Sequence, residues 1–201
     1  MTRSLAVAAA ALLSLPLAAH ATDYTFDPAH TQAGFSVKHM MVTTVHGRFG
    51  KVSGTLSYDA KNPKASTVEA ILETASISTD NEKRDAHLKS PDFFDAEKNP
   101  TVTFKSSKVE TAGKNKLKVT GDLTMHGITK PVVLDVEGPT APVKDPYGNE
   151  KIGATASTKV SRKEFGLNWN KALEAGGVMV GDEVTITLEL EAAAKKVEAA
   201  K

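Results

Sequence analysis

Residues 184–191 read Val-Thr-Ile-Thr-Leu-Glu-Leu-Glu, a strict alternation of apolar and polar side chains. In an extended strand successive side chains point to opposite faces, so this stretch has one apolar face and one polar face. Shorter alternations of the same kind recur along most of the chain after residue 21. Such strands must wrap their apolar faces around a common interior, and what fills that interior is the question of function.

The spacing of these short strands predicts an all-β protein, built as an antiparallel barrel or sandwich. Gly47, Gly54 and Gly121 lie inside the expected strands. A glycine within a strand often marks a bulge or a sharp bend, and a barrel needs such bends to close.

One segment departs from the strand pattern. Thr79-Asp80-Asn81-Glu82 matches a capping box, in which the Thr hydroxyl and the Glu carboxylate satisfy free backbone amides. Pro91 disfavours helical geometry at the residue before it. The sequence therefore predicts a short helix near Asp80–Lys89, too polar for the core, that caps one end of the sheet ahead of Phe93 and Phe94.

The amino terminus has the features of a secretory signal peptide. Arg3 precedes an apolar run, Leu5–Leu17, and Ala19-His20-Ala21 supplies a small-x-small cleavage pattern. We expect cleavage after Ala21, one domain at 22–191, a charged Ala/Lys/Glu tail at 192–201 and export to the periplasm.

Composition excludes several classes of function. The chain has 25 basic and 24 acidic residues and no cysteine, so thiolate chemistry and disulfides are excluded. A net charge of +1 gives no electrostatic reason to expect nucleic acid as a partner. A lipid-facing barrel would need two aromatic girdles, whereas the seven Phe, three Tyr and one Trp are scattered, so we expect no stable membrane insertion.

No motif predicts catalysis or metal binding. The sequence has no His-Glu-x-x-His motif and no Gly-x-Ser-x-Gly elbow. We therefore predict no catalytic residue, no metal site and no cofactor. The histidines beyond the signal show no i, i+4 pair and are interpreted as structural or surface residues: His30, His39, His46, His87 and His126.

The interior itself remains the candidate site. An eight-stranded barrel is just wide enough to be filled by side chains or to hold one ligand. Small residues occur among the bulky ones at the strand positions that face inward, and this mixture is compatible with a cavity or with a solid core. The small ones are Ala33, Gly47, Gly54, Ala70, Gly121, Ala154 and Ala156.

Seven strings, in order, resemble the YceI-like family of polyisoprenoid-binding proteins. They are DPAHT at 27–31, FSVKHM at 35–40, VHGRF at 45–49, RDAHLKSPDFFD at 84–95, PTVTF at 100–104, GDLTMHGITKPV at 121–132 and SRKEFGL at 161–167. The resemblance implies an extended, lipocalin-like, eight-stranded antiparallel β-barrel, periplasmic and often dimeric, whose apolar channel holds an isoprenoid or another long-chain amphiphile. Glu164 stands where the family often has Asp, which keeps the charge.

We therefore predict a periplasmic protein, not an enzyme, that sequesters or carries an isoprenoid or isoprenoid-quinone lipid. The alternatives are a structural or stress-response interaction protein with a filled core, and a lipid-modifying enzyme that would use His39. The expected channel wall is Phe35, Val37, Val45, Phe49, Leu56, Leu72, Phe93, Phe94, Phe104, Leu123, Met125, Leu134, Trp169 and Ile186. The expected hydrogen-bond donors for a polar head group of the lipid are His39, Arg84, His87, Arg162 and Asn168.

Overall fold

A computed structural model describes residues 21–174 and 176–195 of the chain. The predicted signal peptide lies outside these residues, apart from Ala21. The strands are β1 (Thr22–Phe26), β2 (Gln32–His39), β3 (Thr43–Phe49), β4 (Val52–Tyr58), β5 (Thr67–Glu73), β6 (Ile77–Ser78), β7 (Thr101–Gly113), β8 (Lys116–Met125), β9 (Ile128–Glu137), β10 (Val143–Lys144), β11 (Glu150–Ser161) and β12 (Val180–Ala194). The helices are α1 (Glu82–Lys89) and three 3₁₀ turns, η1 (Pro63–Ala65), η2 (Thr74–Ser76) and η3 (Arg162–Phe165).

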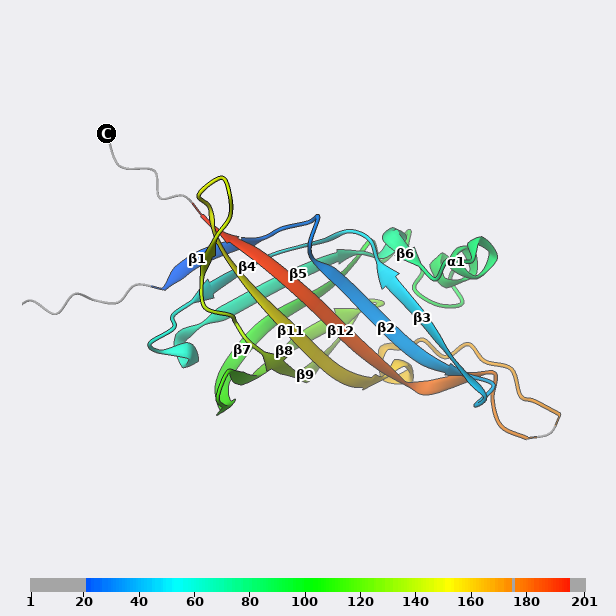
Figure 1. The fold of residues 1–201 in the computed structure, drawn as a ribbon. Coiled ribbons are helices and arrows are strands. Elements are labelled where there is room, and N and C mark those ends of the chain that lie inside the picture. Colours follow the sequence, from blue (N-terminus) through cyan, green and yellow to red (C-terminus); the bar gives the residue numbers. More distant parts are fainter. Residues whose placement is uncertain (1–20, 175, 196–201) are drawn as a thin grey trace, which may run out of the picture.

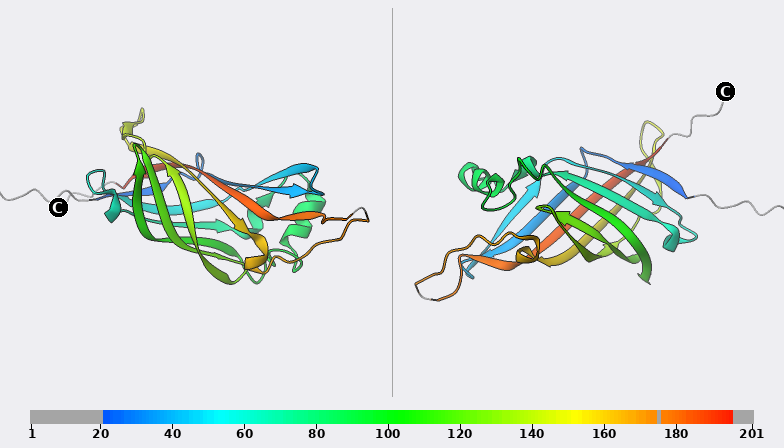
Figure 2. Two further views of the ribbon diagram at one scale, coloured as in Figure 1. Left: turned by 90° about the horizontal axis from the view of Figure 1, so that it is seen from below. Right: turned by 180° about the vertical axis from the view of Figure 1, so that it is seen from behind.

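The strands form an antiparallel barrel that closes on itself. Pairing runs β11-β9-β8-β7-β5-β4-β1-β12, and the β11–β12 ladder then joins the two ends into a ring of eight. The barrel is drawn out along one direction, with α1 at one end and both described chain ends at the other (Figures 1 and 2). The predicted eight-stranded antiparallel barrel is confirmed.

Strand β12 pairs with β11 along one edge and with two different strands along the other edge. Its last residues, Ala192–Ala194, pair with β1, whereas the part from Val180 to Glu189 pairs with β2. Strands β2 and β3 therefore leave the ring as a two-stranded ribbon along the first half of β12, and β6 extends this ribbon by pairing with β3. This branching brings the β2–β3 hairpin to the end of the barrel that carries α1 (Figure 1).

The register places the apolar face of 184–191 inside. Ile186 lies opposite Phe35 of β2 and Thr158 of β11, and Leu188 lies opposite Ala156. Large side chains of β12 thus face small or short ones of β11, because every second residue of both strands points inward.

The strand glycines have a different role from the predicted bends. Pairing is regular at Gly47 and Gly54, and only Gly121 lies beside a register shift. An added Cβ would lie 2.3 Å from the Phe35 ring at Gly47 and 2.5 Å from the Phe104 ring at Gly121. Each glycine therefore makes room for an aromatic ring from a neighbouring strand, as Gly54 does for Phe26.

The predicted helix is present, but its cap differs. Helix α1 begins after Asn81, whose side-chain oxygen accepts a hydrogen bond from the Arg84 amide. Thr79 lies outside the helix and donates its amide and its hydroxyl to the Asp85 carboxylate, at 2.8 and 2.5 Å. The helix is therefore capped by Asn81, and Asp85 holds the preceding turn. No helix in the described part of the chain is long and apolar enough to span a bilayer.

The carboxyl-terminal boundary lies later than predicted. Strand β12 continues to Ala194, and Ala192 is fully buried where it pairs with Phe26. Residues 192–194 are thus part of the barrel wall, because they pair with Tyr24–Phe26 of β1. The rest of the expected tail lies outside the described residues, apart from Lys195.

Candidate functional site

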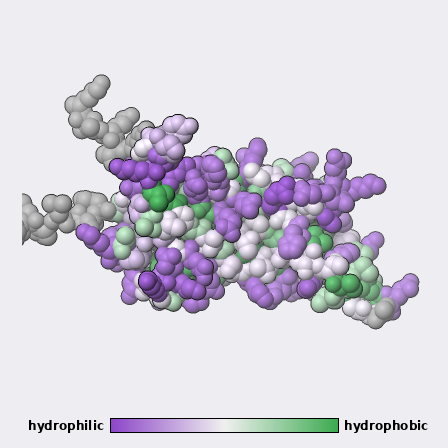
Figure 3. Space-filling model, in the orientation of Figure 1, coloured by the Kyte–Doolittle hydropathy of each residue, from purple (hydrophilic) through white to green (hydrophobic). Residues whose placement is uncertain are grey.

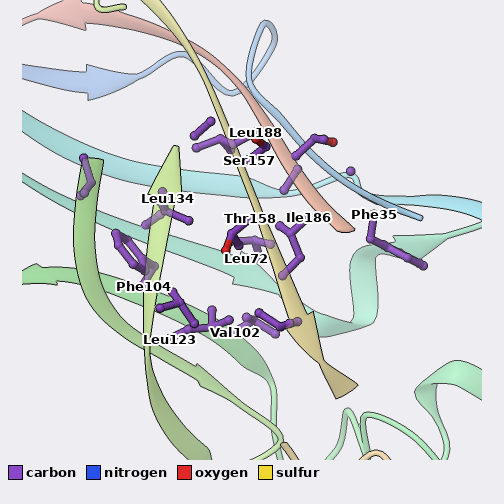
Figure 4. Close-up of a pocket in the computed structure, with 18 of the residues that line it drawn as sticks. Phe35, Leu72, Val102, Phe104, Leu123, Leu134, Ser157, Thr158, Ile186 and Leu188 are labelled. Atoms are coloured by element: carbon purple, nitrogen blue, oxygen red, sulfur yellow. The ribbon is translucent and has the colours of Figure 1, made fainter. Parts of the chain in front are cut away.

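The barrel encloses a long apolar cavity. The cavity has a volume of about 230 Å³, and most of the residues that line it are apolar. Its wall follows β12 from Val180 to Leu190 and β8 from Leu117 to Met125, so the cavity runs along much of the barrel. Residues of β2, β5, β7, β8, β9, β11 and β12 line this space (Figure 4).

Such a void is suited to an apolar guest rather than to water. A buried water needs two to four polar partners. Most residues that line the cavity are apolar, and only a few Ser and Thr residues and Arg162 carry polar groups, so waters inside it would lack most of their partners. The structure thus favours a cavity over the solid core that the sequence left open.

Small residues on the inner face create the space. Ala33, Ala70, Ala154 and Ala156 all line it. The large side chains opposite them, such as Leu188, remain only half-buried because they border the void. The Phe104 ring packs directly against the backbone of Gly121, and this close packing leaves more space in the cavity.

The segment 79–100, which we call the lid, closes one end of the cavity. Phe93 and Phe94 are buried at 8% and 9% exposure and both line the cavity. Phe94 meets the ring of Phe49 edge-on at 5.8 Å, and Phe93 lies 5.2 Å from Trp169. His87 packs edge-on against both Phe93 and Trp169, so the lid is fastened to the loop after η3 by aromatic contacts.

Arg162 is a buried cation at the same end of the barrel. It is 3% exposed and is the only charged residue in the cavity wall among the described residues. Its guanidinium donates to the carbonyl oxygens of Gly181, Leu167 and Val180. Burial lowers the pKa of Arg162, and the charge of Asp182 opposes that shift. The side chain thus ties η3 to the start of β12 and to the following loop.

Twelve of the fourteen residues predicted for the channel wall border the cavity. Val45 and Trp169 do not: Val45 pairs with Val37 in the ribbon, and Trp169 packs against Phe93. Among the expected head-group donors, only Arg162 borders the cavity. Arg84 donates to Thr79, His87 contacts Asp92 at 2.8 Å, and His39 and Asn168 lie away from the wall.

A polar cluster at the other end was not predicted. The ammonium of Lys151 lies 2.6 Å from Asp27 and 2.7 Å from Glu191, and His30 lies 3.2 Å from Asp27. These contacts hold the pKa of Asp27 well below its usual range and raise that of Lys151. Because the ammonium occupies the position between both carboxylates, the cluster is an ion-pair network that joins the β1–β2 loop to β11 and β12.

Tyr24 gives the fold a dependence on alkaline pH. Burial, together with a 2.8 Å hydrogen bond that its hydroxyl donates to Glu150, raises the pKa of Tyr24 to about 12. An unfolded tyrosine ionises near pH 10. The contribution of Tyr24 to stability is therefore complete below pH 10 and is lost as the pH rises towards 12.

We expect chemical denaturation of the wild type to show a stability that falls between pH 10 and 12, with Tyr24 contributing about 2 kcal/mol of that fall. Tyr24→Phe, measured in parallel, should show a smaller fall because it lacks the titrating group. Equal slopes in the two proteins would contradict this assignment.

Comparison with known proteins identifies the family. A model of the YceI-like domain matches residues 24–192. The chain belongs to the YceI-like family. It is 42% identical over 165 residues to a UPF0312 protein of Vibrio cholerae, covering 81% of this chain and 87% of that one. A UPF0312 protein of Vibrio parahaemolyticus is 41% identical over 170 residues, covering 83% and 89%.

Solved structures agree with the YceI-like fold. The YCEI protein of Campylobacter jejuni is 33% identical, with a TM-score of 0.64 and coverage of 86% of this chain and 98% of that one. BcnA of Burkholderia cenocepacia has a TM-score of 0.69 at 24% identity, covering 83% and 98%. A polyisoprenoid binding domain from Saccharophagus degradans has a TM-score of 0.62 at 14% identity, covering 88% and 100%. The last two show a shared fold.

Proposed function

We propose that this protein binds a long-chain lipid of the isoprenoid or isoprenoid-quinone type in its barrel and carries or sequesters it in the periplasm. The observation that carries the proposal is the apolar cavity that follows β12 from Val180 to Leu190. The polyisoprenoid binding domain of Saccharophagus degradans, which shares the fold, supports the choice of ligand class. The signal-peptide pattern at 1–21 supports the location.

Binding rests on burial of the hydrocarbon chain. Each CH₂ group removed from water contributes about 0.8 kcal/mol. A lipid of many carbons therefore needs few polar contacts, provided that the cavity is already formed. The apolar lining and the small inner residues of β11 meet that condition.

The polar head of the lipid is expected at an end of the channel and not within it. The cavity wall is mostly apolar, with a few Ser and Thr residues such as Thr158, and the donors of Arg162 are directed to backbone carbonyls. His39, the residue that an enzyme would use, does not border the cavity. These placements support a binding protein in preference to an enzyme.

Organic extraction followed by mass spectrometry tests the proposal. The protein would be exported by its own signal and purified without detergent. We expect a prenyl-chain lipid at about one molecule per barrel, since one eight-stranded barrel has room for a single ligand. An empty protein that also fails to take up added polyprenols and quinones would refute the proposal.

A further inference from the structure

The tip of the β2–β3 hairpin exposes three consecutive apolar residues. Met40, Met41 and Val42 are 43%, 62% and 77% exposed, and Val178 in the neighbouring loop is 37% exposed. We call these four residues the apolar tip. The hairpin and the loop before β12 extend together beyond the barrel (Figure 1). Hydrophobic side chains gather at that extremity of the molecular surface (Figure 3).

The apolar tip is held by backbone hydrogen bonds. The Met40 amide donates to the Met179 carbonyl at 2.7 Å, and Ala172 pairs with Val178 across the neighbouring loop. Met40 and Met41 have φ values of 51° and 60°, in the left-handed region. Turns of this conformation favour Asn and Gly. Two methionines stand there instead, so the turn presents flexible apolar side chains where small polar ones would serve the fold better.

The strands that carry the apolar tip also contribute to the cavity wall. Val37 and Val180, on the strands that lead to the apolar tip, both line the cavity. His39 pairs with Val180, and the next residue is Met40. The apolar tip therefore begins next to the residue pair His39–Val180, whose Val180 borders the cavity.

We propose that the apolar tip docks onto a phospholipid bilayer, with its Met and Val side chains at the boundary between head groups and acyl chains. This inference rests on the proposed lipid-binding function, because a carrier of a membrane lipid must meet the membrane that supplies it. Docking at the apolar tip brings the lid end of the channel to the bilayer surface.

The size of the apolar tip favours a bilayer over a second copy of the chain. A stable protein interface needs about 800 Å² and 20 to 30 residues on each partner, whereas this surface comprises four apolar residues on two narrow loops. Apolar side chains that reach ~5–10 Å into a membrane interface give reversible binding. The exposed Lys38 and Lys171 lie beside the apolar tip together with the exposed Glu174, so anionic lipid should add little.

Vesicle sedimentation tests the docking. Wild type, Met41→Ser/Val42→Ser and a control, Val143→Ser/Tyr147→Ser, are compared on vesicles of phosphatidylethanolamine and phosphatidylglycerol. Val143 and Tyr147 are 61% and 88% exposed in the segment that includes β10. We expect the apolar-tip variant to bind about 10-fold more weakly, since it loses two apolar side chains at the interface. The control should bind like the wild type.

Loading from detergent micelles separates this inference from the function on which it rests. The apolar-tip variant should take up a polyprenol or quinone from micelles as the wild type does, because its substitutions lie outside the channel. Unchanged vesicle binding by the variant would overturn the docking even if both proteins load lipid. Light scattering gives the oligomeric state of both proteins. If the wild type were a dimer and the apolar-tip variant a monomer, with equal vesicle binding, the apolar tip would bind a second copy of the chain, and the docking proposal would be overturned.

Discussion

Replacing Ala156 by tryptophan is expected to abolish lipid loading while the barrel stays folded. Ala156 lies on the inner face of β11, opposite Leu188 of β12 and Val136 of β9, and borders the cavity. A tryptophan side chain at this position would occupy the void midway along the channel. A ligand chain could then no longer pass, and the added ring would be accommodated largely by existing space.

The measurement is the amount of prenyl lipid recovered per barrel, together with the circular dichroism spectrum and the elution volume. Val133→Trp is the matched control, because Val133 lies on β9 with its side chain 44% exposed on the outer surface. It should retain the wild-type amount of lipid. Full lipid occupancy in a folded Ala156→Trp protein would show that the ligand binds elsewhere.

Replacing Arg162 by methionine is expected to cause the largest loss of stability among these substitutions. The guanidinium satisfies the carbonyl oxygens of Leu167, Val180 and Gly181 in a site that is 3% exposed. Methionine has a similar length but no donor, so these oxygens would lose their partner. We expect a loss of about 2–4 kcal/mol in the free energy of unfolding, because unsatisfied buried acceptors cost about 1–3 kcal/mol each and neighbouring backbone can relax.

Urea denaturation at neutral pH measures this effect. Lys163→Met, in the same 3₁₀ turn, is the control, because its side chain is exposed and should tolerate the change with little effect. If Arg162→Met were as stable as the control, Arg162 would have no role in holding the end of the channel.

The strands could be predicted because alternation is a local property. Residues 184–191 alternate strictly, and they form the central part of β12. The branching of β12 between β1 and β2 could not be predicted, because it depends on which distant strand supplies the next backbone partner. The cap of α1 was misassigned for a related reason: Thr79 matched a local motif, but Asp85 competes for its hydrogen bonds.

Most of the wall residues could be predicted from inward parity, whereas the cavity itself could not. Val45 has the correct parity, yet it lies on the ribbon beyond the cavity, because parity gives a face and not a distance along the strand. The network of Lys151 with Asp27 and Glu191 was missed because these residues are far apart in the sequence. Lys151 is 124 residues from Asp27 and 40 residues from Glu191. The sequence alone did not mark Met41 as part of an interaction surface, because its exposure follows from its position at the tip of a hairpin.

Gly47 affects the channel through the Phe35 ring, which borders the cavity. A carbon atom added there would meet the Phe35 ring and the methyl group of Thr79, both of which are side-chain atoms. At Gly54 and Gly121 the same carbon would lie 2.4 Å from a backbone carbonyl oxygen, so those positions are fixed by the fold. A larger residue at position 47 would therefore displace the Phe35 ring and press on Thr79, which couples the width of the cavity to the start of the lid.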